Sequence, residues 1–411
     1  MRILFVHQNF PGQFPHLAPA LMARGHDVTA LTVSSNKRPS PVPVLHYSYP
    51  TPSFDRSISR YVGNFADRAE RGAAVANAAE KLRAKGYVPD VVFGHFGWGE
   101  TLYLKNIWPA SKLAIYAEFF YHPRGLDADF DPELQRPNLT ANIVTTTLQA
   151  HLLLAMHTAD AALAPTRWQA QTFPAHFQER IAVIHDGIDT ERVRPNPAAQ
   201  ITVGSRIFRA GDEVLTFVSR NLEPYRGFHI FMRALPQILS ARPNAHVVIV
   251  GGQEAGYGPL HASRKPWKQI FLDEVKDRLD LTRVHFVGMI PYTSFVNLMS
   301  VTRAHAYLTY PFVLSWSMLE AMSAGALIVG SATPPVQEII RHDANGLLVD
   351  FFDRQRWAET LIEALSEPDK FAPLRQAARA SILEGYDLKG QCLPRMIKFV
   401  EDLGCASGAA G

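Results

Sequence analysis

The chain has 411 residues, of which 47% are hydrophobic and 19% are charged, and its formal net charge is +3. This length predicts two domains of roughly 200 residues each, and the balance of apolar and charged residues excludes bulk disorder. The small net charge argues against a nucleic-acid-binding protein, but it is compatible with acidic small substrates or with contact to an anionic membrane surface.

The cysteines and the first residues indicate the compartment. Cys392 and Cys405 are too few for a disulfide scaffold, and no Cys/His cluster with zinc-ligand spacing is present. We therefore expect a cytoplasmic protein. Met1–His7 predicts a first strand rather than a signal peptide. No window approaches about 18 uninterrupted apolar residues, so we expect no membrane-spanning helix.

Short apolar runs alternate with helical patterns in the first half of the chain. The helical patterns Leu17–Arg24 and Asp67–Lys85 are followed by Gly25 and Gly86, which can adopt the left-handed conformation at a helix end. This alternation predicts a parallel sheet with helices on both faces. The predicted strands are Ile3–Val6, Val28–Thr32, Val91–Phe93, Leu113–Tyr116, Ala161–Ala164 and Ile181–Ile184.

The segment Arg192–Gly204 contains Pro195 and Pro197 and is predicted to be a linker. The alternation then starts again, which predicts an α/β protein with two doubly wound domains and a cleft at the carboxyl ends of both sheets. The predicted units are strand Val214–Ser219, helix Gly227–Arg242, strand His246–Val250, helix Trp267–Leu279, strand Val284–Val287, further units at Phe295–Ser300, Ala304–Leu308, Ser315–Ser323 and Leu327–Gly330, and helix Lys389–Leu403. The predicted domains are residues 1–200 and 201–385, followed by a C-terminal helical segment at 386–405.

The turn after the first strand, His7–Gln13, contains Gly12 and joins a strand to a helix. Its backbone N–H groups could face an anion. The turn lacks G-x-G-x-x-G, which disfavours a dinucleotide cofactor. An ordinary strand-to-helix turn explains this pattern equally well.

Two arginines follow the predicted strand Val214–Ser219. Arg220 and Arg226 lie six residues apart at the carboxyl end of that strand, where they could hold a diphosphate through charge-assisted hydrogen bonds. A pair of solvated surface arginines is the slightly favoured alternative on this pattern alone.

A third pattern runs from Tyr310 to Gly325. A strand ends near Tyr310 and a helix begins near Ser315, which can act as its N-cap. The free N–H groups and the dipole of such a helix start favour an anion. Glu320 could accept two hydroxyl groups of a ribose, although a solvent-facing helix glutamate is the commoner case.

Two further patterns could indicate binding sites, but a purely structural role is favoured for each. Asp127, Asp129 and Asp131 have the spacing with which carboxylates hold a divalent metal, but they lie in a polar loop without a partner histidine, which favours a turn-forming acidic loop. The basic and aromatic run Arg264–Lys268 could touch lipid or an acceptor. A solvated helix start is the favoured reading of that run.

Several motifs together resemble a known family. In the first half they are Phe10–Gln13, Leu21–Val28, Pro89–His95 and Val183–Asp189. In the second half they are Arg220 with Arg226–Gly227, Phe286–Gly288, Leu319–Gly325, Glu338–Ile340 and Asn345–Val349. In this order and spacing the chain resembles the family-4 retaining glycosyltransferases of the GT-B fold over nearly its whole length.

The resemblance implies two Rossmann-like domains facing a central cleft, with the last helix returning to the N-terminal domain. It also implies roles in binding a nucleotide-sugar donor. The implied donor contacts are Arg220 and Arg226 at the diphosphate, Glu320 at the ribose, the backbone of Leu314, Ser315 and Trp316 at the phosphates, and the backbone near Met289 and Ile290 at the base. Gly12 would let the donor phosphate approach the N-terminal domain, and His95 would lie on the acceptor side.

The chain departs from the family pattern at three positions. Phe312 stands eight residues before Glu320, where the E-x7-E motif has its first glutamate. A phenyl ring accepts no hydroxyl hydrogen bond, so the donor-sugar contacts must differ, as would suit a deoxy or otherwise less polar sugar. Arg226 replaces the usual lysine. Glu118 stands where the family often has histidine, and it is a candidate acceptor or sugar contact, with a buried structural carboxylate as the alternative.

The function implied by the resemblance is transfer of a sugar from a UDP- or GDP-sugar to an acceptor hydroxyl, with retention at the anomeric carbon and without a metal or other cofactor. The acceptor is a glycan, a lipid-linked molecule or a protein, as in bacterial surface glycan or glycoconjugate synthesis, and peripheral contact with the inner face of the membrane is compatible with it. Three alternatives stay open: a nucleotide-sugar epimerase, a phosphorylase, and a catalytically silent nucleotide-sugar-binding subunit.

Overall fold

The computed structural model describes residues 1–49, 61–135, 138–254 and 256–405. It divides into two compact units. The first comprises Met1–Gly187 together with the C-terminal segment from Lys389, and the second is Ile188–Leu388. The boundary precedes the predicted one at residue 200 because Val193 and Ala199 are buried in the hydrophobic core of the second unit.

The first unit contains a seven-stranded sheet in the order β3-β2-β1-β4-β5-β6-β7, and all its neighbouring strands are parallel. The order reverses at β1, so β1 and β4 flank the switch point of a doubly wound sheet. The strands are β1 (Arg2–Val6), β2 (Asp27–Val33), β3 (Val44–Tyr47), β4 (Val91–His95), β5 (Lys112–Tyr116), β6 (Ala161–Ala164) and β7 (Ile181–Val183).

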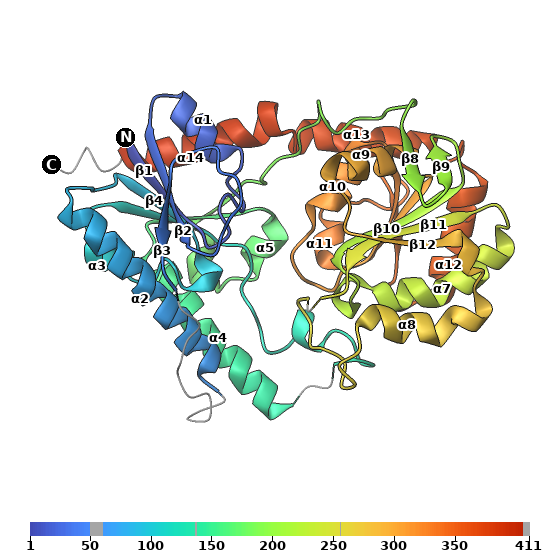
Figure 1. Ribbon diagram of the computed structural model, residues 1–411, viewed down its shortest axis with the longest axis horizontal. Coiled ribbons are helices and arrows are strands. Elements are labelled where there is room, and N and C mark those ends of the chain that lie inside the picture. Colours follow the sequence, from blue (N-terminus) through green and yellow to red (C-terminus); the bar gives the residue numbers. More distant parts are fainter. Residues whose placement is uncertain (50–60, 136–137, 255, 406–411) are drawn as a thin grey trace. The chain divides into compact units, whose positions relative to one another are not determined.

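Helices cover both faces of this sheet (Figure 1). Helices α1 (Leu17–Ala23) and α14 (Leu393–Cys405) pack together on one face. On the other face lie α2 (Gly63–Ala84), α3 (Leu104–Ile107) and α4 (Leu139–Thr158). The short helices of this unit are α5 (Arg167–Gln171), α6 (Ala175–Gln178) and the 3-10 turns Phe96–Trp98 and Asp127–Asp129.

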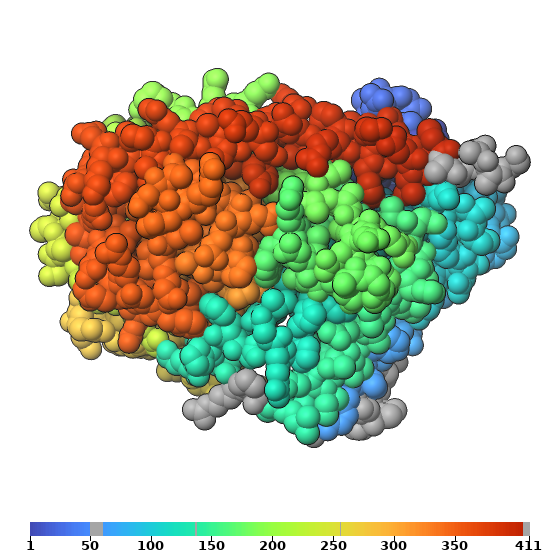
Figure 2. Space-filling model, turned by 180° about the vertical axis from the view of Figure 1, so that it is seen from behind, coloured from blue at the N-terminus to red at the C-terminus, as the bar shows by residue number. Residues whose placement is uncertain are grey.

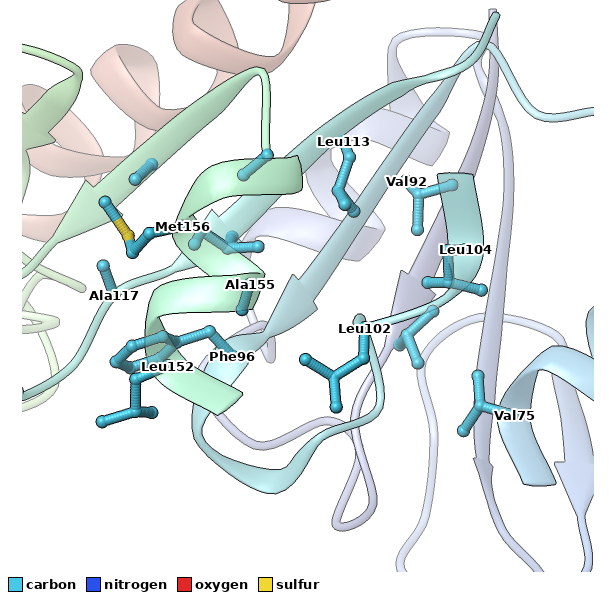
Figure 3. Packing of buried hydrophobic residues seen from close by; sticks show 14 of the residues in the cluster. Val75, Val92, Phe96, Leu102, Leu104, Leu113, Ala117, Leu152, Ala155 and Met156 are labelled. Carbon is cyan, nitrogen blue, oxygen red and sulfur yellow. The ribbon is translucent and has the colours of Figure 1, made fainter. Parts of the chain in front are cut away.

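Helix α4 is not among the helices predicted from the sequence, although it is the second longest helix in the described part of the first unit. Its C-terminal half inserts Leu152, Ala155 and Met156 into the core beneath the sheet (Figure 3). By length and composition alone α4 could cross a membrane, because it contains no charged residue, whereas the sequence analysis expected no such helix. One such helix is weak evidence for a membrane span, since core helices of globular domains pass the same test.

The second unit contains a six-stranded parallel sheet in the order β12-β11-β10-β13-β14-β15. The order reverses at β10, so its switch point lies between β10 and β13. The strands are β10 (Val214–Asn221), β11 (His246–Gly252), β12 (Val284–Gly288), β13 (Ala304–Tyr307), β14 (Leu327–Ser331) and β15 (Leu347–Val349).

The helices of the second unit also form two layers (Figure 1). Helices α7 (Phe228–Ala241), α8 (Trp267–Val275) and α12 (Arg354–Ser366) pack together on one side of the sheet. Helices α9 (Tyr292–Val301), α10 (Trp316–Ser323) and α13 (Ala372–Gly385) pack on the other side, and α13 is part of the red surface in Figure 2. Helix α11 (Pro334–Gln337) follows β14.

Local details of the prediction are confirmed in some places and corrected in others. Gly25 and Gly86 follow α1 and α2 with φ angles of 88° and 80°, as predicted for helix-ending glycines. The predicted linker is wrong at its end, because Gln200–Val203 (β8) pairs antiparallel with Arg206–Arg209 (β9). The C-terminal helical pattern is divided into a π turn, Leu388–Cys392, and α14.

Candidate functional site

The two arginines that follow β10 lie in different environments. Arg220 occupies the carboxyl-terminal part of β10 and is exposed. Arg226 ends the 3-10 turn Pro224–Arg226 and is only 7% exposed. The next residue, Gly227, has a φ angle of 66°, and a Cβ there would lie 2.3 Å from Cβ of Leu308. A glycine is therefore required for the chain to turn at this point from β10 into α7.

Arg226 holds the segment that leads into α10. Its Nη1 donates hydrogen bonds to Oγ1 of Thr309 at 2.8 Å and to the carbonyl oxygen of Val313 at 2.9 Å. A charged donor that binds a carbonyl group inside the protein fixes the backbone on which that carbonyl lies. Arg226 thus shapes the approach to the helix start as well as placing positive charge beside it.

The start of α10 has the geometry of an anion site. Ser315 is the N-cap residue, and its hydroxyl accepts the N–H of Ser317 at 3.3 Å. The N–H of Ser315 donates to the hydroxyl oxygen of Tyr307 at 2.8 Å, and burial raises the pKa of Tyr307. Leu314 and Ser315 are half-buried, and Trp316 is 40% exposed. The N–H of Met318 donates to the carbonyl oxygen of Ser315 at 3.3 Å, so the group that favours an anion here is the positive end of the helix dipole.

Glu320 has a partner that sequence reasoning missed. The hydroxyl of Tyr292 donates to Oε1 of Glu320 at 2.6 Å, and the guanidinium carbon of Arg192 lies 4.4 Å from the centre of the Tyr292 ring. Burial raises the pKa of Glu320, while the Tyr292 hydrogen bond and the charge of Arg192 lower it. Tyr292 thus orients the carboxylate that the family resemblance assigns to the ribose. A tyrosine 28 residues away in the chain gives no sequence pattern that would reveal this contact.

The other predicted donor contacts of this unit differ in exposure. Met289 is 68% exposed and Ile290 is half-buried, both directly after β12. Phe312 is 2% exposed, because the rings of Tyr225 and Tyr257 lie 5.6 Å and 4.8 Å from it. The side chain that reaches the surface at this place is Tyr257, which is 44% exposed.

In the first unit, Gly12 lies directly against His7. Its φ angle is 51°, and a Cβ there would lie 2.6 Å from Nε2 of His7. Nδ1 of His7 accepts the N–H of Asn9 at 2.9 Å, and burial lowers the pKa of His7 to about 3. A neutral imidazole therefore supports the turn after β1.

A buried carboxylate, that of Glu100, also stabilises the turn after β1. Glu100 is fully buried, and it accepts the N–H of Gln8 at 3.0 Å and the hydroxyl of Tyr47 at 2.6 Å. Arg71 donates to Oε1 of Gln8 at 2.5 Å. Burial raises the pKa of Glu100. No sequence pattern reveals this role of Glu100, because Gln8, Tyr47 and Arg71 come from three separate segments of the chain.

The structure brings together two predicted residues of the acceptor side. Nε2 of His95, at the end of β4, lies 3.4 Å from Oε2 of Glu118, and Nε2 of Gln13 lies 3.3 Å from Oε1 of the same carboxylate. Nδ1 of His95 accepts the N–H of Gly97 at 3.1 Å, which assigns the proton of a neutral imidazole to Nε2. The Glu118 side chain is 35% exposed, so it is not the fully buried carboxylate of the alternative reading.

The acidic loop uses two of its carboxylates to hold backbone. Oδ1 of Asp129 accepts the N–H of Gly125 at 2.7 Å. Oδ1 of Asp131, a fully buried residue, accepts the N–H groups of Glu133 and Leu134 at 2.9 and 3.1 Å. Carboxylates in this role stabilise a turn.

Replacing Gly12 by alanine is expected to destabilise the protein by more than the same change at Gly25. Both glycines have positive φ, which costs an alanine roughly 1–2 kcal/mol. A Cβ at Gly12 also meets the His7 ring, whereas at Gly25 nothing lies within 4 Å. Urea unfolding of both variants measures the difference. Equal losses of unfolding free energy in the two variants would show that the turn after β1 accommodates a Cβ at position 12 without additional strain.

Two family models match the chain. Residues 24–193 match the glycosyl transferase family 4 group, and residues 205–381 match the glycosyl transferases group 1. Together these matches cover most of both units. The chain belongs to the family-4 glycosyltransferases.

The chain spans about half the length of the curated relatives that it matches. It is 27% identical over 209 residues to the D-inositol 3-phosphate glycosyltransferase of Thermobispora bispora, covering 49% of this chain and 46% of that protein. It is also 27% identical over 210 residues to the GDP-mannose-dependent alpha-(1-6)-phosphatidylinositol monomannoside mannosyltransferase of Mycobacterium tuberculosis, covering 47% of this chain and 49% of that protein.

Solved structures share the fold over nearly the whole chain. Anabaena HepE in complex with UDP aligns with a TM-score of 0.68 at 18% identity, covering 98% of this chain and 100% of that chain. Sucrose-phosphate synthase from Thermosynechococcus elongatus aligns with a TM-score of 0.74 at 16% identity, covering 99% and 100%. The fold is therefore GT-B, with two parallel-sheet α/β domains.

Proposed function

We propose that the protein transfers a glycosyl group from a nucleoside-diphosphate sugar, a UDP- or GDP-sugar, to an acceptor hydroxyl with retention at the anomeric carbon. The observation that carries this proposal is that Arg220, Arg226 and the start of α10 all lie at the carboxyl ends of β10 and β13, which are neighbouring strands. The two halves of the chain also match glycosyltransferase models. Ligands of doubly wound sheets bind at the carboxyl ends of the strands, at the switch point.

The proposed chemistry places negative charge where these groups are. As the bond between the anomeric carbon and the diphosphate oxygen breaks, the leaving diphosphate gains charge, and fixed donors aimed at it stabilise the transition state. The acceptor oxygen forms its bond to the same face of the anomeric carbon, and its proton passes to the departing phosphate oxygen. The proposal includes no metal, because the two arginines and the helix start supply the positive charge.

Residues of the first unit are proposed to bind the acceptor. The carboxylate of Glu118, next to His95 and Gln13, can accept a hydrogen bond from a sugar hydroxyl. Gly12 lies in the turn after β1 of the same unit, and its proposed role is to let the donor phosphate approach that turn. The acceptor is proposed to be a glycan, a lipid-linked molecule or a protein of bacterial surface glycan or glycoconjugate synthesis, and the protein is proposed to be cytoplasmic. Peripheral membrane contact belongs to the same proposal, and co-sedimentation with vesicles of anionic phospholipid tests it.

Thermal unfolding with and without UDP, GDP and their sugars tests the donor class. A nucleotide at about 100 times its dissociation constant is expected to stabilise the folded protein by roughly 2.7 kcal/mol. If neither UDP nor GDP stabilises the protein, the proposal is wrong. If a nucleotide does stabilise the protein, incubation with the donor separates the alternatives: an isomerised sugar with donor alone indicates an epimerase, whereas no turnover with any acceptor indicates a silent binding subunit. Chelation of metals should leave the rate unchanged.

A further inference from the structure

An aromatic cluster occupies the switch point of the second unit. Tyr225 follows β10, Tyr257 follows β11, and Phe312 follows β13, and these are three neighbouring strands of the sheet. The ring of Phe312 lies 4.8 Å from that of Tyr257 and 5.6 Å from that of Tyr225. The guanidinium carbon of Arg226 lies 5.4 Å from the centre of the Tyr257 ring and 5.9 Å from that of Phe312. The cluster therefore borders the proposed diphosphate site.

Glu223 anchors the loop that carries Tyr257. This carboxylate is 2% exposed, and its two oxygens accept the N–H groups of Tyr257 at 3.1 Å and of Gly258 at 3.0 Å. Two N–H groups bound by one buried carboxylate hold a turn firmly, because charge-assisted hydrogen bonds are about twice as strong as neutral ones.

The loop also packs closely enough to require glycine on both sides of Tyr257. A Cβ at Gly256 would lie 2.1 Å from Oε1 of Glu223, and a Cβ at Gly258 would lie 2.9 Å from the ring of Tyr225. Side chains at these positions would push the loop away from the cluster. The Tyr257 ring is thus fixed over Phe312 and Arg226, while 44% of the residue stays exposed.

We propose that Tyr257 is a specificity-determining residue for the donor sugar, that Glu223 positions it, and that the preferred sugar is a 6-deoxyhexose. The proposal rests on the proposed function. Phe312 stands where the family pattern has the first glutamate of its E-x7-E motif. In the structure the ring of Tyr257 packs over Phe312. An aromatic face offers no acceptor to a hydroxyl group, so a hydroxyl pressed against it loses its hydrogen bonds to water without replacement. The exocyclic C6 projects furthest from a pyranose ring, and a methyl group there suits an aromatic wall.

The experiment compares matched donors in the full-length protein. The pairs are UDP-glucose with UDP-6-deoxyglucose, and GDP-mannose with GDP-6-deoxymannose. We expect kcat/KM to favour the 6-deoxy donor by about 10-fold or more, within the range that an apolar pocket achieves. We expect Tyr257→Ala to reduce this ratio to near 1, and Tyr257→Phe to keep it because the ring decides the preference. Leu260→Ala, an exposed apolar residue of the same loop, is the matched control and should keep the ratio.

Glu223→Gln tests the positioning role. The amide keeps the size of the side chain but presents an NH₂ group to one of the two backbone N–H groups, which breaks that hydrogen bond. We therefore expect a smaller ratio of kcat/KM between the 6-deoxy and 6-hydroxy donors, with unchanged affinity for UDP and GDP. A wild-type preference for the 6-hydroxy donor, or a ratio that Tyr257→Ala leaves unchanged, overturns the inference while leaving the proposed function intact. Absence of UDP and GDP binding overturns the proposed function itself, and the inference with it.

Discussion

Replacing Arg220 by alanine is expected to lower kcat by about 10²–10³-fold, which corresponds to roughly 3–4 kcal/mol of lost transition-state stabilisation. The reason is the position of Arg220 at the carboxyl end of β10, where an exposed guanidinium can reach the charge that develops on the leaving diphosphate. Steady-state kinetics with the preferred donor measures the effect. Urea unfolding should show nearly unchanged stability, because an exposed side chain contributes little to the core.

Substitutions of two other arginines serve as comparisons for the Arg220→Ala variant. Arg209 on β9 is also exposed, and Arg209→Ala removes the same charge away from the carboxyl edge of the sheet, so it should leave kcat within about twofold. Arg226→Ala should lower both activity and stability, because it removes the hydrogen bonds to Thr309 and Val313 from a buried position. Equal rates for wild type and Arg220→Ala would rule out the diphosphate role of Arg220.

Lowering the pH from 7 to 5 is expected to destabilise the protein by several kcal/mol through four buried histidines. Burial lowers the pKa of His7 and His305 to about 3, and that of His151 and His185 to about 4. In the unfolded chain a histidine has a pKa of about 6.5. Between pH 6.5 and pH 4 the unfolded state therefore binds protons that the folded state does not.

The sign of this effect follows from linkage. A lowered folded-state pKa stabilises the protein above the unfolded pKa, and that stability is lost as the pH falls toward the folded pKa. Each buried histidine accounts for about 2 kcal/mol between pH 7 and pH 5. Urea unfolding at the two pH values and at fixed ionic strength measures the total.

A single substitution tests the contribution of one histidine. His305 is fully buried, and among the described residues its Nε2 has no hydrogen-bond partner. His305→Leu should reduce the loss of stability between pH 7 and pH 5 by about 2 kcal/mol, whatever it does to stability at pH 7. His157, which is exposed on α4, is the control, and His157→Leu should leave the loss unchanged. An undiminished loss in His305→Leu would show that His305 takes up its proton in the folded state.

The alternation of strands and helices was determined by the sequence itself. Burial on both faces of a parallel strand produces a short continuous apolar run, and Gly25 and Gly86 end their helices for a local steric reason. These are properties of neighbouring residues, so they can be read without knowing the fold. The candidate positions Arg220 and Ser315 follow in the same way, because each stands where a strand ends or a helix begins.

Only the tertiary structure decided which side chains meet. The pairing of Glu118 with His95 and Gln13, and that of Glu320 with Tyr292, join residues that are far apart in the chain. The burial of Arg226 and Phe312 depends on a loop that Glu223 holds in place. Such contacts depend on strand order and loop packing, which leave no periodic pattern in the sequence. The helix α4 was missed for a related reason: threonine, asparagine and glutamine interrupt its apolar residues, and it is helical because its C-terminal half packs into the core of the first unit.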